Sequence, residues 1–226
     1  FGDRNIDQSK DYLDNEEWNK DEADIILNMT NREYKAYIET YPNSDYDMCE
    51  YMTIGTKFYR QLIMKGGMML HASGVVYNGK AYLFSADSGT GKSTHTSIWM
   101  KNLKDKAFII NDDKPAIVNE DGKWFVYGTP WSGKTDMNVN AKAELGAIIF
   151  IERSDVNYIE KITAKEAVPL IFKQTVRKII EERMDKLLWI MDKLLKEVRL
   201  YKLGCDISDE AFAVAFKELT GEDAHV

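Results

Sequence analysis

The chain has 226 residues, of which 44% are hydrophobic and 12% aromatic, enough to build a buried core in one large domain. Its 30 Lys and Arg residues against 37 Asp and Glu residues give a formal charge of −7, which repels a nucleic-acid backbone. Because no apolar stretch approaches the ~20 residues that a membrane span requires, we expect neither nucleic acid nor a membrane as a partner.

The cysteines and the first thirty residues provide no site. Cys49 and Cys205 lie far apart in the sequence without a second ligand at metal-binding spacing, so we expect neither zinc nor a disulfide framework. Residues 1–30 are rich in Asp, Glu, Asn and Lys, which predicts an acidic, loosely docked segment before a single domain over 31–226. No charged and apolar leader opens the chain, and we expect a cytoplasmic protein.

The first elements of the domain are predicted to be a helix and a hairpin. Apolar residues at helical spacing predict a helix over 45–64, packed on the domain. Two strands, 68–77 and 80–85, flank Asn78-Gly79, the dipeptide that favours a two-residue hairpin turn. They should therefore pair antiparallel and lead into a helix over 92–101.

The rest of the chain is predicted to contain further strands, a second hairpin and helices. Residues 107–110 form a buried strand by composition, and Asp121-Gly122 predicts a second hairpin between strands 116–119 and 124–127. Later elements are expected as strands 147–151 and 158–162, a helical region with Met184, Leu187, Leu188, Met191, Leu194 and Leu195 on one face, and a strand over 198–203. Ser208 should cap a final helix that Gly221 closes, with Ile207 packed on Phe212 as a hydrophobic staple.

The loop after strand 80–85 has the chemistry of a phosphate cradle. It follows the pattern G-x-x-x-x-G-K-S/T except that Ala86 stands at the first glycine position. Glycines let backbone N–H groups point into one concavity, Lys92 would reach the β- and γ-phosphates, and the Ser93 hydroxyl would coordinate magnesium. The predicted nucleotide-binding residues are Ser88, Gly89, Thr90, Gly91, Lys92, Ser93 and Thr94. The alternative is a loop that only connects a strand to a helix.

Two carboxylates follow the strand over 107–110. Asp112 and Asp113 should emerge at its end, where α/β proteins gather their sites. One carboxylate would hold magnesium and the other would accept the proton of an attacking hydroxyl. We assign Asp112 to the metal, with Ser93, and leave open which of the two acids is the base. The alternative is a pair of solvated turn aspartates.

Other candidate site residues surround this pair in the sequence. His71 could modulate the carboxylates or contact a phosphate, or it could be a satisfied core histidine. His95 would either pack or line the nucleotide pocket. Residues 127–134 combine two glycines, a proline and Trp131 with Lys134, which predicts a second wall of the site. Lys134 would then neutralise charge on the transferred phosphoryl group, whereas the alternative is a hairpin connection with a tryptophan lid.

These motifs together resemble a known family. His71-Ala72-Ser73 before a hairpin, the loop Ser88–Ser93 and Asn111-Asp112-Asp113 are similar to the catalytic domain of HPr kinase/phosphorylase, and the spacing is similar to the nucleotide half of ATP-dependent phosphoenolpyruvate carboxykinase. The resemblance covers roughly residues 68–135. It implies an α/β fold with a P-loop and a mixed sheet flanked by helices.

The same resemblance implies an activity. It would be ATP- and magnesium-dependent phosphorylation of a serine hydroxyl, with Lys92 and Ser93 on phosphate and metal, an acidic pair containing the base, and His71 upstream. Ala86 departs from that family's loop, and its arginine-bearing signature is not found, so phosphorolysis and the HPr substrate are not carried over.

Two functions of different classes follow from these observations. The first is a kinase that uses ATP and Mg²⁺ to phosphorylate a serine-bearing protein, a peptide or free serine. The second is a non-catalytic regulatory module that binds ATP and orders the 127–135 loop for a partner. The sequence leaves open whether the chain forms a homo-oligomer.

Overall fold

A computed structural model of the chain describes residues 46–175 and 181–224. The chain divides into two compact units, residues 1–65 and 66–226. In the first unit the described element is helix α3 (Tyr46–Met64), which confirms the helix predicted over 45–64. The predicted boundary after residue 30 lies outside the described residues and stays a prediction.

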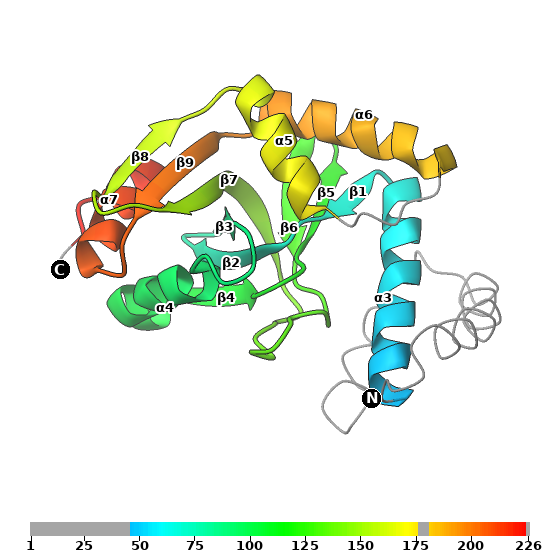
Figure 1. Cartoon of the computed structure of the whole chain (residues 1–226), viewed down its shortest axis with the longest axis horizontal. Coiled ribbons are helices and arrows are strands. Elements are labelled where there is room, and N and C mark those ends of the chain that lie inside the picture. Colours follow the sequence, from blue (N-terminus) through cyan, green and yellow to red (C-terminus); the bar gives the residue numbers. More distant parts are fainter. Residues whose placement is uncertain (1–45, 176–180, 225–226) are drawn as a thin grey trace. The chain divides into compact units, whose positions relative to one another are not determined.

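The second unit is built on one mixed sheet with helices packed around it, which confirms the predicted mixed α/β class (Figure 1). The strands run in the order β1-β5-β6-β7-β3-β2-β4, with β9 paired to β7 and β8 paired to β9. Their bounds are β1 (Gly67–Met69), β2 (Ala72–Tyr77), β3 (Lys80–Ser85), β4 (Ala107–Asn111), β5 (Ala116–Glu120), β6 (Lys123–Tyr127), β7 (Lys142–Arg153), β8 (Tyr158–Lys161) and β9 (Leu200–Cys205). The helices are α4 (Lys92–Leu103), the short 3₁₀ turn η1 (Lys104–Lys106), α5 (Ala164–Gln174), α6 (Glu181–Glu197) and α7 (Asp209–Thr220).

Both predicted hairpins are present. Asn78 and Gly79 have φ of 48° and 74°, the positive values that a tight antiparallel turn needs, and β2 pairs antiparallel with β3. Asp121 and Gly122 do the same between β5 and β6. The single strand predicted over 68–77 is wrong, because the chain breaks at Leu70-His71: β1 pairs with β5, whereas β2 pairs with β3 and β4.

Three strands that lie side by side run parallel, and this arrangement positions the site. β7 pairs parallel with β3 on one side and with β9 on the other. Their carboxyl ends therefore open at one edge of the sheet, where the segments after Ser85, Arg153 and Cys205 begin. In open α/β sheets this edge is the usual place for a ligand.

An aromatic cluster anchors α4 and α7 to the sheet. Trp99 of α4 is fully buried, and its ring lies 5.4 Å from that of Phe84 in β3 and 5.3 Å from that of Phe212 in α7. Figure 1 shows α4 next to β2 and β4, with α5 and α6 above the sheet. Because α4 begins directly after the loop that follows β3, this packing holds the loop between two buried elements.

The helical last third is confirmed with two corrections. Ser208 accepts a hydrogen bond from the Ala211 N–H as the N-cap of α7, and Gly221 ends that helix in the left-handed region. Ile207, however, is 79% exposed, so the predicted staple with Phe212 is wrong. In α6 the predicted apolar face buries Leu187, Met191, Leu194 and Leu195, but Leu188 points to solvent. None of the described helices has the length and apolarity that crossing a bilayer demands.

Candidate functional site

The loop between β3 and α4 has the open, glycine-dependent shape expected of a phosphate cradle. Gly89 and Gly91 have φ of 77° and 124°, a region that favours glycine, and a Cβ added at either would meet nothing within 4 Å. The Thr90 N–H closes the turn on the Asp87 carbonyl at 3.2 Å. The space above both glycines is therefore open to a ligand.

Ala86, the departure from the glycine pattern, has a packing role. Its side chain is 6% exposed and belongs to the core cluster around Trp99 and Phe84. Its backbone is not in the left-handed region, so no glycine is needed there. The methyl group thus fills the core beneath the loop and leaves the cradle unchanged.

Lys92 lies under the loop. Its side chain is 7% exposed, and its Nζ donates to the carbonyls of Ala86 at 3.0 Å and Asp87 at 3.4 Å. Burial lowers the pKa of the ammonium group, while the charges of Asp113 and Asp112 raise it. Lys92 is therefore within electrostatic reach of the acidic pair, although Lys92 begins α4 and the two acids follow β4. The other predicted cradle residues Ser88, Ser93 and Thr94 are exposed around it.

Asp112 is held from two sides. It is 5% exposed, and its Oδ1 accepts a short hydrogen bond from Ser73 Oγ of β2. Its Oδ2 accepts from Thr135 Oγ1 at 2.8 Å. Such burial differs from that of a solvated turn aspartate, and each carboxylate oxygen keeps a second lone pair for another ligand.

Asp113 contacts two basic side chains, His71 and Lys114. His71 Nε2 lies 3.1 Å from Asp113 Oδ1, and Lys114 Nζ lies 3.3 Å from the same carboxylate. Burial raises the pKa of Asp113, but the hydrogen bond from His71 and the charge of Lys114 outweigh it, so the pKa is lowered overall. His71 itself lies in the break between β1 and β2, and not inside a strand as predicted from the sequence.

The end of α5 joins these contacts to the loop. His71 Nδ1 lies 2.9 Å from Gln174 Oε1, and Gln174 Nε2 donates to Asp87 Oδ1 at 2.8 Å. Lys173 forms an ion pair with the other oxygen of Asp87. Sequence analysis missed Asp87, Lys173 and Gln174, since the contact joins segments that are 86 or 87 residues apart.

The loop after β6 lies against the acidic pair, as the second-wall prediction requires. Asn111 Nδ2 donates to the Thr129 carbonyl at 2.8 Å, which holds the start of this loop. A Cβ added to Gly133 would lie 3.1 Å from Asp113 Cβ, so the backbone there touches the carboxylate side chain. Trp131 is buried, whereas Lys134 is exposed in the turn that follows.

The oxygen-bearing side chains around the loop fit a magnesium ion of the kind that accompanies a nucleotide. The described residues contain no group of three or more His, Cys, Asp or Glu side chains placed to bind a metal. Magnesium, however, keeps several waters and commonly takes one or two carboxylates together with substrate phosphates. Asp112 and the exposed Ser93 hydroxyl would supply the protein ligands.

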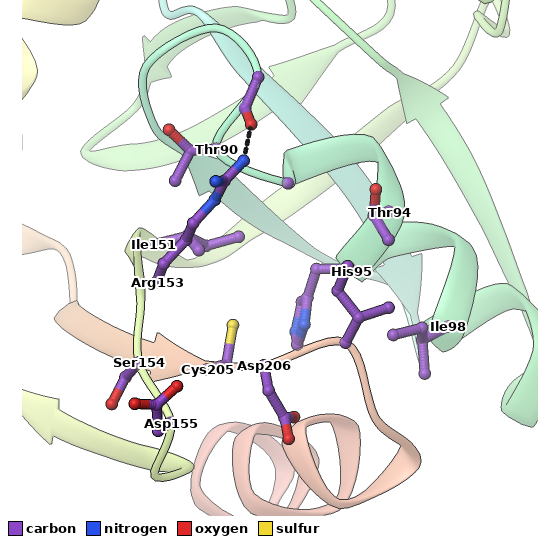
Figure 2. A pocket seen from close by; sticks show the side chains of 13 residues that line it. Thr90, Thr94, His95, Ile98, Ile151, Arg153, Ser154, Asp155, Cys205 and Asp206 are labelled. Carbon is purple, nitrogen blue, oxygen red and sulfur yellow. Dashed lines mark hydrogen bonds between the residues drawn. The ribbon is translucent and has the colours of Figure 1, made fainter.

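A pocket of about 650 Å³ borders the loop at Gly89, Thr90 and Gly91 (Figure 2). Arg153 at the end of β7 donates from Nη2 to the Gly89 carbonyl at 2.6 Å and so joins the loop to the pocket wall. The pocket continues past His95 of α4 to Cys205 and Asp206 at the end of β9. We call it the side pocket, bounded by Gly91, His95, Ile98, Arg153, Cys205 and Asp206.

A family model and solved structures match the chain. The family model for "SynChlorMet cassette protein ScmC" matches residues 36–209. A solved structure, that of the Hpr(Ser) kinase/phosphatase from Coxiella burnetii, is similar at a TM-score of 0.39 and 11% identity, over 68% of this chain and 94% of that one. Comparison with curated proteins gives no match.

Proposed function

The chain belongs to the family of the SynChlorMet cassette protein ScmC. From the geometry of its site, we propose that it is an ATP- and magnesium-dependent phosphotransferase acting on a serine-type hydroxyl. One observation carries the proposal. The buried Lys92 ammonium under an open glycine loop lies within electrostatic reach of Asp112 and Asp113. Phosphoryl transfer needs this combination of a phosphate cradle, positive charge and carboxylates.

Each residue has a role that its surroundings support. The loop N–H groups and Lys92 hold the β- and γ-phosphates. Lys134, which lies in the exposed turn, neutralises negative charge on the transferred phosphoryl group. Asp112, fixed by Ser73 and Thr135, holds magnesium together with Ser93. Asp113 is the base, and its lowered pKa keeps it ionised near neutral pH. When bound, magnesium neutralises charge on the phosphates.

The proposed step is a single displacement. The hydroxyl oxygen of the acceptor forms a bond to the γ-phosphorus, and the bond from that phosphorus to the β,γ-bridging oxygen breaks. ADP leaves with the electron pair, and the hydroxyl proton passes to Asp113. His71 and Lys114 hold the Asp113 carboxylate for this proton. The acceptor is a protein, a peptide or free serine that reaches the space between Asp113 and the loop.

The test is transfer of labelled phosphate. The full chain is incubated with γ-labelled ATP and Mg²⁺ against free serine, an HPr-like protein and short serine-ended peptides. We expect one acceptor to be labelled, and we expect Lys92→Ala to abolish labelling. Lys106→Ala, which removes an exposed lysine in η1, is the matched control and should leave labelling intact.

A non-catalytic ATP-binding module is the second candidate, and the link from Asp87 to α5 favours it. Binding of ATP to the loop would shift α5 through the contact between Asp87 and Gln174, and a partner protein could bind the shifted helix. Asp113→Asn separates the two functions, with exposed Asp105→Asn as its control. The kinase requires that the variant binds nucleotide but transfers nothing. Nucleotide binding without transfer to any acceptor, in the unsubstituted chain, would favour the module.

A further inference from the structure

The side pocket lies where a part of the nucleotide beyond the phosphates would lie. Its walls are the carboxyl ends of the parallel strands β7 and β9 and the first turns of α4, and it shares Gly89, Thr90 and Gly91 with the phosphate loop. None of its described lining residues belongs to the acidic pair. The pocket, which is of ligand size, thus borders the phosphate loop but not the carboxylates.

His95 presents a buried hydrogen-bond donor there. The imidazole is 3% exposed, and its Nε2 lies 3.1 Å from Trp99 Nε1. An indole N–H can only donate, so Nε2 is unprotonated. Burial lowers the pKa of His95 to about 4, so the ring is neutral at pH 7 and its proton sits on Nδ1.

That proton has no acceptor in the part of the chain that the structure describes. His95 Nδ1 is fully buried, and no described residue lies within hydrogen-bonding distance of it. Figure 2 shows the ring pointing from α4 toward Cys205 and Asp206 at the far wall of the pocket. Buried polar groups are nearly always paired, because an unmade hydrogen bond is costly. The missing acceptor is therefore expected on a ligand.

The rest of the lining fits a flat heteroaromatic ring. Ile98 and Ile151 supply apolar surface beside His95. Burial raises the pKa of the Cys205 thiol to about 11, so this side chain is an uncharged, compact contact at neutral pH. The polar lining residues besides His95 are Thr90, Thr94, Arg153, Ser154, Asp155 and Asp206. Apolar surface beside a buried donor suits a ring that carries an acceptor nitrogen at its edge.

We propose that the side pocket binds the purine base of the nucleoside triphosphate and that His95 Nδ1–H donates a hydrogen bond to a ring nitrogen of that base. This inference rests on the proposed function, since the phosphate loop must hold the triphosphate for the base to reach the pocket. In this arrangement His95 and the ends of β7 and β9 recognise the base, whereas the phosphate loop binds the phosphates.

The first experiment compares two ligands on the unsubstituted chain. Binding of a non-hydrolysable ATP analogue and of inorganic tripolyphosphate, each with Mg²⁺, is measured by calorimetry. If the base is bound, the ATP analogue binds about tenfold more tightly or better. Equal affinities would overturn this inference while the phosphate cradle stands. Absence of binding by both ligands would overturn the proposed function as well.

The second experiment uses two substitutions with opposite expectations. In His95→Asn the amide N–H can take the place of Nδ1–H, but the acceptor for Trp99 is lost. In His95→Gln the amide oxygen can reach Trp99, but the Nδ1 donor is lost. We expect His95→Gln to weaken ATP-analogue binding about fivefold without changing tripolyphosphate binding, and His95→Asn to stay within about twofold. The reverse order would show that His95 serves only Trp99, and the inference would fail.

Discussion

Gln174 Nε2 lies 2.8 Å from Asp87 Oδ1, so the last residue of α5 holds the start of the phosphate loop. The same amide meets His71, which in turn contacts Asp113. A helix that the sequence analysis did not connect with the site thus touches both its phosphate side and its acidic side.

Replacing Gln174 should loosen the loop. Gln174→Leu removes the hydrogen bonds to Asp87 and His71 at a position that is 9% exposed. We expect amide hydrogen exchange in residues 87–91 to become about threefold to tenfold faster. Lys173→Ala is the control, because its ion pair with Asp87 is exposed and should change exchange by less than about twofold. Equal effects of both substitutions would contradict the role given to Gln174.

The contact between Gly133 and Asp113 predicts a defect in transfer. Gly133→Ala places a Cβ 3.1 Å from Asp113 Cβ and strains a backbone with φ of 68°. We expect kcat to fall about tenfold or more, with nucleotide affinity nearly unchanged, since a displaced base costs rate more than binding. Gly79→Ala carries similar strain at φ of 74° with nothing within 4 Å, and it should leave kcat unchanged.

Ser73 should be needed to keep Asp112 in the core. Ser73 is fully buried and contacts both Asp112 and Thr96. Ser73→Ala leaves a buried carboxylate short of one donor, and we expect the free energy of unfolding to fall by about 1 to 3 kcal/mol in urea titration. The double variant Ser73→Ala with Asp112→Asn should lose less than the sum of the two single losses. Additive losses would show that the two side chains do not act together.

His95 should make stability depend on pH. Its pKa in the folded chain is about 4, below the ordinary value of 6.5, so the unfolded chain binds more protons between these values. The stability that neutral His95 contributes is complete above about pH 6.5 and is lost as the pH falls toward 4. Between pH 7 and pH 5 this amounts to about 2 kcal/mol. His95→Gln does not titrate, so its urea midpoint should change less over this interval than that of the unsubstituted chain.

The sequence predicted the local features of this fold more completely than the distant ones. Asn78-Gly79 and the cap Ser208 are local, because the required φ values and hydrogen bonds involve neighbouring residues. Strand β7 was predicted only over 147–151, since its first residues alternate between exposed and buried and lack the continuous apolar run. Helix α5 was not resolved separately, although Thr163 and Glu166 form a capping box at its start.

The site divides in the same way. The loop and the acidic pair were visible as motifs, and the structure brings Lys92 and Asp113 within electrostatic reach. Gln174 and Arg153 carry no motif, and they reach the loop only because β7 and α5 fold back over it. The individual catalytic and binding roles stay predictions for the experiments above.

At the edge formed by the parallel strands β3, β7 and β9, different segments would bind the phosphates and recognise the group attached to them. Under the proposed function, binding of the polyphosphate would depend on one short turn, and recognition of the group attached to it would depend on the tips of two neighbouring strands. We therefore expect substitutions after Arg153 or Cys205 to change ligand preference in related chains without disturbing that turn. Divergence within this family should accordingly concentrate at those tips.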